Sequence, residues 1–446
     1  MNIVEFFRTG ADKPLLQDKQ QIDRIYQRKR FSVFWTLVLG YGFFYTCRLS
    51  LSVTKKHLIE AGVMDASELG MVGASLFYVY AFGKAINGFL ADGADISRFM
   101  SVALLCSAFV NICFGLASSL WVFALLWALN GWFQSIGSAP SVVSLCQWFS
   151  HSERGTRYGI WAGAHNIGEG LTFVGTSALV SYFGWRWGFL GPGAVCLVVA
   201  VTMFFTLADR PETYGLPKVA DWREDYAAGK PSGGALWDLQ KAVLKNPVVW
   251  ILGLSSATMY ITRYAVHSWG PLYLQSAKGY SVLESGVLIG ANTMAGLAGA
   301  ACSGLISDKF FNSRRNVPAL LYGLLLIASL VSLYYVPPGQ RTLDALALAC
   351  FEFAIGGLVV FLAGLIAVDL VPTRAAGAVK GVIGFFSYLG AATQEWISGG
   401  LIEAGKKMTD DGTAAYDFDT VFLFWIGSAV ASTLLACLVW NAKPTE

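Results

Sequence analysis

The stretch GFLADGADISR, residues 88–98, has a counterpart in the second half of the chain, GLISDKFFNSRR, residues 304–315. Each places an aspartate four positions after a glycine and a basic residue six positions after that aspartate: Gly88, Asp92 and Arg98 in the first, Gly304, Asp308 and Arg314 in the second. The offset along the chain between the two glycines equals the offset between the two aspartates. A shared offset of this kind indicates an internal repeat, in which two halves of the chain have the same architecture.

The composition indicates a membrane protein. Of the 446 residues, 55% are hydrophobic and 14% are charged, against about 25% charged residues in a typical soluble domain. Apolar stretches of about 20 residues, long enough to cross a bilayer as a helix, recur along the chain. We predict twelve spans: 32–53, 68–90, 99–118, 121–146, 157–183, 187–207, 247–274, 283–306, 316–336, 343–368, 376–402 and 419–440.

One long polar connection, rich in proline, glycine and charge, divides these spans into two groups of six. We therefore predict five parts: an N-terminal segment 1–31, an N-terminal six-helix half 32–208, a linker 209–246, a C-terminal six-helix half 247–441 and a tail 442–446. An even number of spans puts both termini on one side of the membrane. The basic cluster Arg28, Lys29 and Arg30, directly before the first span, predicts that this side, with the linker, is the cytoplasm. The first thirty residues lack the apolar core of a secretory signal.

Each half carries an arginine inside a predicted span. Arg48 lies in GYGFFYTCRLSLS, residues 40–52, and Arg263 lies in SSATMYITRYAVHSW, residues 255–269. The offset between these two arginines matches that of the repeated glycines to within one position. An arginine in the middle of a bilayer costs roughly 3 kcal/mol on insertion scales, and it cannot lose its proton to escape that cost. The nearest acids to Arg48, Asp23 and Glu60, both lie outside its span. Parallel repeats with a site between them are typical of the major facilitator fold, so we predict an all-α membrane protein of that fold.

Two interpretations of the arginine pair are open. Either the side chains reach headgroups or a buried acid, or both guanidinium groups point into a watery cavity between the halves and hold an anion. Planar guanidinium groups with paired N–H donors suit the several oxygens of a phosphate. On the second interpretation the counter-charge of both arginines is the ligand and not a residue of the chain. The ligand would turn repulsion between the halves into attraction, as a rocking transporter requires.

Other ionisable residues inside the spans are candidates for the same site. Lys84 adds positive charge to the half that holds Arg48, although packing is the alternative. His165 is either a phosphate contact or a neutral, hydrogen-bonded core residue. Glu169, one turn later, can partner His165 or Lys84, and Glu352 and Glu395 are further buried carboxylates that can act as counter-charges.

A second set of residues is predicted to face the sugar part of a ligand. Tyr41 and Tyr45 precede Arg48 by seven and three residues and share its helix face, although packing is the default for any single aromatic residue. His267 follows Arg263 by one turn, and Lys380 in the eleventh span reaches either the site or the headgroups. The repeated Gly–Asp–Arg motifs lie at helix ends, where they predict a conformational latch: the glycines permit close helix approach, and the aspartates cap a helix or pair with an arginine.

The remaining features exclude several classes of protein. The eight cysteines lie in apolar segments and show no paired framework or metal-ligand spacing, so we predict no metal and no cofactor. No nucleophile–base pair is visible, which argues against an enzyme. The net charge of +3 gives no indication of nucleic-acid binding. The expected surroundings are therefore a lipid bilayer and a small anion, with the protein acting as a monomer.

Several segments resemble the organophosphate:phosphate antiporters, and they span nearly the whole chain. They are GYGFFYTCRLSLS, YAFGKAINGFLADG, NGWFQSIGSAPS, AGAHNIGEG and RYAVHSWGPLYL. The resemblance implies that Arg48 and Arg263 bind the substrate phosphate, that Lys84 and His165 assist, and that Tyr41 and Tyr45 line the cavity. It also implies a multi-pass protein of the bacterial inner membrane that works by alternating access.

The N-terminal segment and the linker look closest to the hexose-phosphate branch of that family. This branch implies exchange of glucose 6-phosphate for inorganic phosphate, or alternatively a receptor that senses external glucose 6-phosphate and signals to a histidine kinase. The chain departs from the family pattern at Leu49, Thr293 and Lys380, where a lysine after the first arginine, an acidic residue and an Asp–Lys pair are common. These departures leave the phosphate site intact and put sugar specificity and counter-ion coupling in question.

Overall fold

The computed structural model describes residues 3–225, 241, 243–311, 315–362, 366, 376–408 and 414–440. Within these residues the chain is almost entirely helical, because a segment surrounded by lipid can satisfy its backbone only through internal hydrogen bonds. The one sheet found there is an antiparallel hairpin in which β1 (Lys406–Met408) pairs with β2 (Ala414–Tyr416).

Six crossings build the first half of the molecule, and the first and fourth of them are each broken into two helices. In order they are α2 (Lys19–Thr46) with α3 (Ser50–Glu60), α4 (Ala66–Ala91), α5 (Ile96–Leu116), α6 (Leu120–Gln134) with α7 (Ser138–Trp148), α8 (His151–Phe183) and α9 (Trp187–Thr206). The short helix α1 (Ile3–Phe7) precedes them, and η1 (Pro211–Tyr214) and α10 (Val219–Arg223) follow.

Six crossings also build the second half, and the first of these is again irregular. They are α12 (Pro247–Tyr264), η2 (Ala265–Trp269) and α13 (Gly270–Ala277) together, then α14 (Val282–Phe310), α15 (Asn316–Tyr335), α16 (Arg341–Val360), α18 (Ala376–Ala404) and α19 (Asp419–Leu438). The prediction of twelve crossings in two groups of six is confirmed.

The repeat extends to the way in which equivalent helices begin. α4 starts at a capping box, in which Asp65 accepts from the Glu68 backbone and the Glu68 side chain accepts from the Asp65 backbone. α14 starts at the same device, built from Ser281 and Glu284, at the offset that separates the repeated glycines. A capping box satisfies two backbone donors that a helix start would otherwise leave unpaired. The same signal therefore fixes the start of the second crossing in each half.

The outer surface suits a bilayer. Large apolar side chains lie exposed on the outward faces of the bundle, for example Trp121, Phe205 and Leu423, which are 73%, 79% and 71% exposed. Among the described helices, eight are long and apolar enough to cross a membrane. The four crossings outside that set are α2–α3, α8, α12–η2–α13 and α18, and these carry most of the polar site described below.

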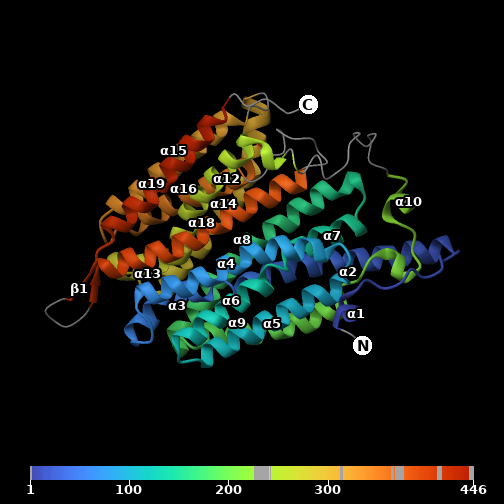
Figure 1. Ribbon diagram of the computed structural model, residues 1–446, viewed down its shortest axis with the longest axis horizontal. Helices are drawn as coiled ribbons and strands as arrows, with labels where there is room; N and C mark the ends of the chain where they lie inside the picture. Colours follow the sequence, from blue (N-terminus) through green and yellow to red (C-terminus); the bar gives the residue numbers. More distant parts are fainter. Residues whose placement is uncertain are drawn as a thin grey trace.

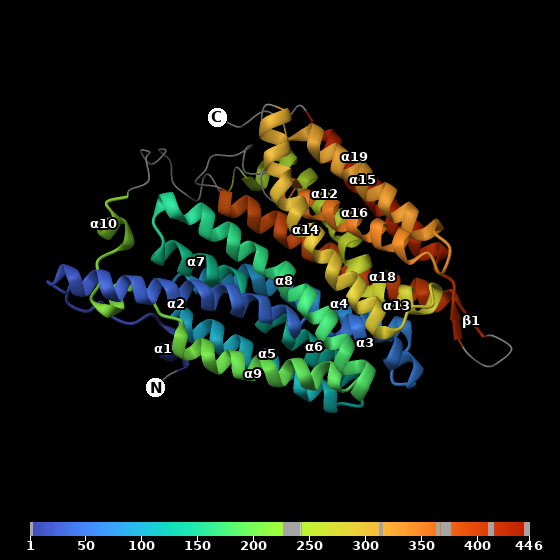
Figure 2. The ribbon, with the colours of Figure 1, turned by 180° about the vertical axis from the view of Figure 1, so that it is seen from behind.

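The two halves lie side by side and pack against each other from one end of the bundle to its middle. Figures 1 and 2 show β1 at one end of the molecule and α1 and α10 toward the other, here called the hairpin end and the termini end. At the hairpin end, α4 meets α18: the Ala66 amide donates to Glu403 at 3.1 Å, and a Cβ added to Gly70 would lie 2.6 Å from the Glu395 carbonyl oxygen. α8 meets α14 as closely, since a Cβ on Gly286 would lie 2.5 Å from the Phe173 carbonyl oxygen.

The same four helices are apart at the termini end. An added Cβ would meet no heavy atom of the described residues within 4 Å, other than atoms of its chain neighbours and of the backbone of its own helix, at four glycines. These are Gly88 of α4, Gly155 of α8, Gly304 of α14 and Gly381 of α18. Contact between the halves is therefore concentrated toward the hairpin end in this structure.

Candidate functional site between the halves

Arg48 lies where the first crossing breaks. Residues 47–49, between α2 and α3, leave the helical ladder. The carbonyl oxygen of Cys47 accepts hydrogen bonds from the side-chain amides of Asn111 and Asn130, at 3.0 and 2.8 Å. These amides replace the backbone donor that a continuous helix would supply, so the break costs little inside the bilayer.

Aromatic side chains surround the Arg48 guanidinium. One of its Nη atoms donates to Tyr264 Oη at 2.8 Å. Its central carbon lies 4.5 to 5.9 Å from the centroids of five rings, those of Tyr45, Phe77, Tyr80, Tyr264 and Tyr388. None of the ion pairs among the described residues includes Arg48, although the residue is only 5% exposed. The rings offset part of the cost of burial, at about 0.5 to 2 kcal/mol for each well-placed ring.

Arg263 lies at the matching point of the seventh crossing. α12 gives way after Tyr264 to the π-helical turn η2, and Pro271 follows. A proline lacks the N–H that would bond to the carbonyl four residues earlier, and π-helical turns are frequent at functional sites. One Nη of Arg263 donates to Glu169 on α8 at 3.0 Å, and this ion pair joins the two halves. Of the two interpretations of the arginine pair, a buried acidic partner therefore applies to Arg263 in this structure.

A second pair of side chains continues from Glu169. The other carboxylate oxygen of Glu169 lies 3.8 Å from His267 Nδ1, and His267 Nε2 lies 2.7 Å from Glu352 Oε1. Arg263, Glu169, His267 and Glu352 thus form one continuous buried ion chain that crosses from α12 to α8 and back to α16.

The two arginines meet at Tyr264. Arg48 donates to its hydroxyl, and the Arg263 guanidinium carbon lies 5.7 Å from the centroid of its ring. The Nε atoms of Arg48 and Arg263 are buried and have no hydrogen-bond partner among the described residues. Buried donors without partners are rare in proteins, and two guanidinium groups that reach the same tyrosine suit an anion with several oxygens. We call Arg48, Arg263 and Tyr264 the arginine site.

Little space is present beside Arg48. A cavity of about 10 Å³ is lined by side chains of both halves, among them Arg48, Phe77, Tyr264, Ser268 and Glu395. That volume holds about one water molecule. A larger ligand therefore requires these side chains, or the halves themselves, to move apart at this level.

Lys84 is connected to the arginine site through an aromatic ring. Its side chain is partly buried on α4, and Nζ lies 4.9 Å from the centroid of Tyr388 on α18. The same ring lies 5.3 Å from the Arg48 guanidinium carbon. A third positive charge therefore lies near Arg48, one aromatic ring away.

The Major Facilitator Superfamily model matches residues 37–393 of the chain. The chain belongs to this superfamily. Three relatives place it in the organophosphate:phosphate antiporter branch. The Salmonella typhimurium membrane sensor protein UhpC is 34% identical over 403 residues, which cover 88% of this chain and 90% of the relative. A Bacillus subtilis glycerol-3-phosphate transporter is 32% identical, with 95% of each chain covered. A probable hexose phosphate transport protein of Chlamydia pneumoniae is 29% identical, with 99% of this chain and 98% of the relative covered.

A solved structure has the same fold. A bacterial homologue of the human lysosomal transporter Spinster, in an inward-facing and unoccupied conformation, superimposes with a TM-score of 0.74 and covers 93% of this chain and 97% of its own. The two sequences are only 16% identical. The predicted fold is thereby confirmed. The superfamily and the relatives that are named as transporters show that the chain belongs to a class of transporter proteins and not to a class of enzymes.

The predicted sugar-side residues of this major facilitator protein lie in different places. The ring centroids of Tyr41 and Tyr45 lie 5.7 Å apart. The ring centroid of His165, a predicted phosphate contact, lies 5.9 Å from that of Tyr45, and its Nδ1 is hydrogen-bonded to a carbonyl oxygen of its own helix. His267 instead belongs to the buried ion chain. Lys380 is exposed on the first turns of α18, eight residues before Tyr388, so the structure does not bring it to the arginine site.

The part of the predicted latch that the structure describes is not assembled in this conformation of the superfamily member. Asp92 is exposed at the end of α4, and Arg98 pairs with Asp95 at 3.2 Å instead. Asp95 also caps α5 by accepting from the Ser97 and Arg98 amides, so it takes the role predicted for Asp92. Neither Gly88 nor Gly304 makes a close helix contact with the described residues. Arg314 and the Asp308 side chain lie outside the described part of the chain.

Sequence reasoning missed Lys55, which is fully buried between the halves. Its Nζ lies 2.9 Å from Glu395 on α18, donates to Ser268 at 2.6 Å, and lies 3.4 Å from the Trp269 ring centroid. Lys55 follows Arg48 by seven residues, two helical turns, which is the one signal in the sequence that could have found it. The contact lies between the arginine site and the hairpin end, and it holds the halves together there.

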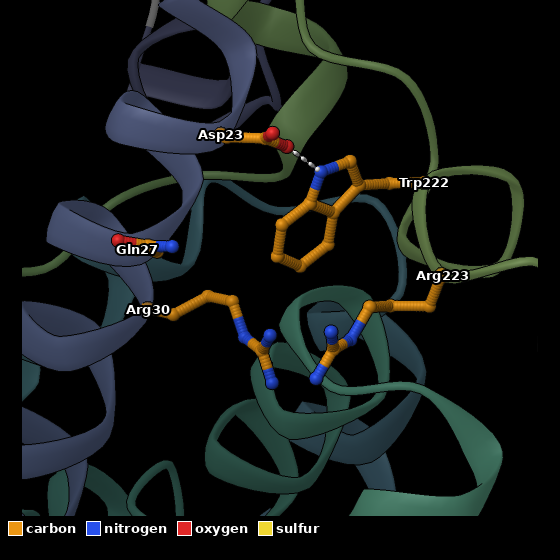
Figure 3. Close-up of a pocket in the computed structure, with 5 residues that line it drawn as sticks. All are labelled: Asp23, Gln27, Arg30, Trp222 and Arg223. Atoms are coloured by element: carbon orange, nitrogen blue, oxygen red, sulfur yellow. Dashed lines mark hydrogen bonds between the residues drawn. The ribbon is translucent and has the colours of Figure 1, made fainter. Parts of the chain in front are cut away.

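A larger hollow lies at the termini end, away from the arginine site. Its volume is about 290 Å³, and Asp23, Gln27, Arg30, Trp222 and Arg223 line it. Figure 3 shows the Arg30 and Arg223 guanidinium groups side by side beneath the Trp222 ring. Both arginines pair with Glu153, and the Trp222 indole donates to Asp23 at 2.6 Å.

The charges in this hollow balance, since two arginines face two carboxylates. Burial alone raises the pKa of Glu153, but hydrogen bonds and charges from Arg223 and Arg30 hold that pKa below its ordinary value. These four charged side chains hold the beginning of the linker against α2 and α8. Because their charges balance, the hollow does not favour the binding of a free anion.

Proposed function

We propose that this protein is a bacterial inner-membrane antiporter that exchanges a hexose phosphate, with glucose 6-phosphate as the leading substrate, for inorganic phosphate by alternating access. The observation that carries the proposal is the arginine site. Arg48, without a carboxylate partner among the described residues, and Arg263 converge on Tyr264 between two repeated halves. A phosphate between them supplies the missing acceptors for their N–H donors and neutralises two positive charges.

The roles of the other residues follow from their positions. Lys84 supports the negative charge of the ligand from the side of Tyr388. His165, Tyr41 and Tyr45 form a cluster adjacent to Arg48 along α2 and α8, and we assign them to the part of the cavity that meets the phosphate and the sugar. Specificity for a hexose rests on the tyrosine hydroxyl groups, which can bond to sugar hydroxyls.

Glycine spacing supports alternating access. Gly70 and Gly88 on α4, Gly286 and Gly304 on α14, and Gly381 and Gly399 on α18 are each eighteen residues apart. Eighteen residues are five turns of an α-helix, so the two glycines of each pair lie on one face. One member of each pair contacts the opposite half at the hairpin end, and the other faces open space at the termini end. The free glycines suit a second state in which the termini end closes and the hairpin end opens.

The orientation follows from charge. Arg28, Lys29 and Arg30 precede the first apolar stretch, so we place the termini end in the cytoplasm. The structure then corresponds to a state that opens toward the cytoplasm. Closure of α4 at Gly88 onto α18, and of α14 at Gly304 onto α8, would belong to the opposite state, in which the latch motifs act.

A second candidate function is that of a receptor. The Salmonella typhimurium relative with 34% identity is named a membrane sensor protein, which favours a receptor that uses the same site. We propose a histidine kinase as the partner to which such a receptor would report occupancy. Both functions need the arginine site, and both need the halves to respond to a ligand. They differ in whether the ligand crosses the membrane.

Proteoliposomes that contain the purified protein and are loaded with inorganic phosphate test the proposal. We expect uptake of labelled glucose 6-phosphate that depends on internal phosphate and is inhibited by external phosphate. Glycerol 3-phosphate, added as a competitor, ranks the substrates. If the protein binds glucose 6-phosphate and no label enters, the receptor function replaces the antiporter function. If inorganic phosphate neither binds nor competes, the phosphate-centred site is wrong.

A further inference from the structure

Two buried polar atoms without hydrogen-bond partners face each other beside Arg263. They are Glu169 Oε2 and His267 Nδ1, 3.8 Å apart, and both side chains are 1% exposed. Neither atom has a hydrogen bond to any described residue. An unpaired polar atom inside a protein is costly, and a hydrogen bond between these two needs a separation of only about 2.8 Å. A small rotation of the Glu169 carboxylate would make that bond and weaken its bond to Arg263.

Charged groups approach His267 from several helices. Glu169 and, further away, His165 come from α8, Glu352 comes from α16, and Arg263 and Tyr264 precede His267 in its own segment. Lys55 of α3 and Glu395 of α18 also lie near the segment, but they pair with each other at 2.9 Å and contact it through Ser268 and Trp269.

The charge of the buried ion chain depends on one proton. With a neutral His267, Arg263 carries one positive charge against the two carboxylates Glu169 and Glu352, so the chain has one net negative charge. A proton on His267 brings the sum to zero. Arg263 keeps its proton under all ordinary conditions, so the exchangeable proton belongs to the histidine and its carboxylate neighbours.

We propose that anion binding at the arginine site is coupled to the uptake of one proton by His267 and Glu352, with Glu169 as the moving group. The inference rests on the proposed function, because it takes phosphate as the anion that reaches Arg263. The phosphate replaces the Glu169 carboxylate at the Arg263 guanidinium, and the released carboxylate turns to His267 Nδ1. The proton comes from the aqueous phase.

The chemistry of the imidazole explains the coupling. His267 already has a carboxylate at Nε2, where Glu352 Oε1 lies 2.7 Å away. A neutral imidazole has one N–H, so it can donate to one carboxylate only, whereas the imidazolium ion donates to two. A second carboxylate at Nδ1 therefore favours the protonated form. By reciprocity the proton then strengthens anion binding as much as the anion strengthens proton binding.

Calorimetry on the full-length protein in lipid nanodiscs tests the coupling. Glucose 6-phosphate and inorganic phosphate are titrated between pH 6 and 9 in two buffers with different ionisation enthalpies, and the difference in heat counts the protons taken up. The ligand's own ionisation is subtracted from the count. We expect close to one additional proton per bound anion, and an affinity that falls by up to about tenfold per pH unit as the pH rises. Binding with no additional proton at any pH overturns the inference and leaves the antiporter proposal intact.

Three variants assign the proton. His267→Asn keeps a polar group beside Glu169 but cannot take up a proton, so we expect binding without the additional proton. Glu352→Gln should reduce the uptake, and His57→Asn, in a helix-end histidine outside the ion chain, should match the unchanged protein. An unchanged proton count in His267→Asn overturns the inference. Loss of anion binding in both His267→Asn and Glu352→Gln also overturns it, because the pair would then hold the anion itself. If the unchanged protein binds neither anion, the proposed function fails as well.

Discussion

Arg48 and Arg263 occupy matching positions in the two halves, and yet their surroundings are opposite. Arg48 lies among five aromatic rings and belongs to no ion pair among the described residues. Arg263 lies 3.0 Å from Glu169 and begins a chain of four ionisable side chains. The internal repeat thus places the two arginines at matching positions, whereas residues that differ between the halves determine what surrounds each of them.

The difference suggests two roles. A guanidinium held by aromatic rings stays accessible to an anion, because rings compensate a positive charge only in part. A guanidinium bound to a carboxylate must exchange that carboxylate for the ligand. On this account Arg48 attracts phosphate without first having to release a carboxylate. Phosphate binding at Arg263 instead displaces Glu169 and so rearranges Glu169 and His267.

Exchanging each arginine for lysine gives the largest expected loss of phosphate affinity. Arg48→Lys loses the two-pronged contact at the residue with no other counter-charge among the described residues, so we expect phosphate affinity to fall by about 30-fold or more, which corresponds to at least about 2 kcal/mol. Arg263→Lys keeps an attraction to Glu169 and should lose less. Equilibrium binding of labelled phosphate measures both.

The control for this pair is Arg186→Lys. Arg186 bonds to the Gly115 carbonyl oxygen, away from the arginine site, and its exchange should leave affinity unchanged. A greater loss in Arg263→Lys than in Arg48→Lys would reverse the assignment of roles.

Removing the carboxylate partner tests the other side of the comparison. Glu169→Gln leaves Arg263 without a counter-charge, which we expect to destabilise the protein by about 3 to 5 kcal/mol. Saturating phosphate should restore much of that loss, because it takes the vacated position. Thermal unfolding with and without phosphate measures the effect.

Glu395→Gln is the matched control for this experiment. It breaks the equally buried ion pair with Lys55, so it should also destabilise the protein, but phosphate should restore less. An equal response of the two variants to phosphate would mean that the anion does not reach Arg263 in particular.

A larger side chain at Gly88 tests whether the protein reaches a second state in which the termini end is closed. A Cβ added to Gly88 meets no described atom within 4 Å here, so we expect Gly88→Leu to leave ligand binding in this state unchanged. In the state with a closed termini end, the added side chain should cost about 1 to 3 kcal/mol, which slows exchange by about tenfold or more. Exchange in proteoliposomes and binding in detergent separate the two quantities.

Gly400→Leu serves as its control. Gly400 also has open space around it among the described residues, but it does not share the helix face of Gly381 and Gly399. Exchange at the normal rate in Gly88→Leu would remove the support that glycine spacing gives to alternating access.

Tyr264→Phe gives the smallest expected effect. It removes the hydroxyl that accepts from Arg48 and keeps the ring between the two arginines. We expect phosphate affinity to change by about fivefold, the value of roughly one net hydrogen bond. Tyr260→Phe keeps the ring near Arg263 and removes a hydroxyl that does not bond to Arg48, so it is the control in the same binding assay. Equal effects in the two variants would mean that the Tyr264 hydroxyl does not link the arginines.

The sequence carries the signals that decide the fold. Apolar length, the repeated motifs and the two arginines predict twelve crossings in two halves, and the capping boxes of α4 and α14 repeat at the same offset. These signals are local, so each can be read within a few residues. The pairing of Arg48 with Tyr264 and of Arg263 with Glu169 depends on which helix faces meet across the interface.

Glu169 shows why those contacts escape sequence reasoning. Along α8 it lies one turn from His165, so the sequence suggests a pair with that histidine, or with Lys84 through charge. In the folded protein α8 packs closely against α14, and Glu169 of α8 lies beside Arg263 and His267 instead. Sequence reasoning missed Lys55 for a related reason. Lys55 follows a break in the helix and lies near what resembles the end of a span. Its burial depends on contacts with α18 and η2.

A structure of the protein with bound glucose 6-phosphate tests the central claim most directly. The account predicts that the phosphate group lies between the Arg48 and Arg263 guanidinium groups, within hydrogen-bond distance of both, and that Glu169 has turned from Arg263 to His267. A phosphate bound elsewhere, or a phosphate at Arg48 with Glu169 still paired to Arg263, would contradict it.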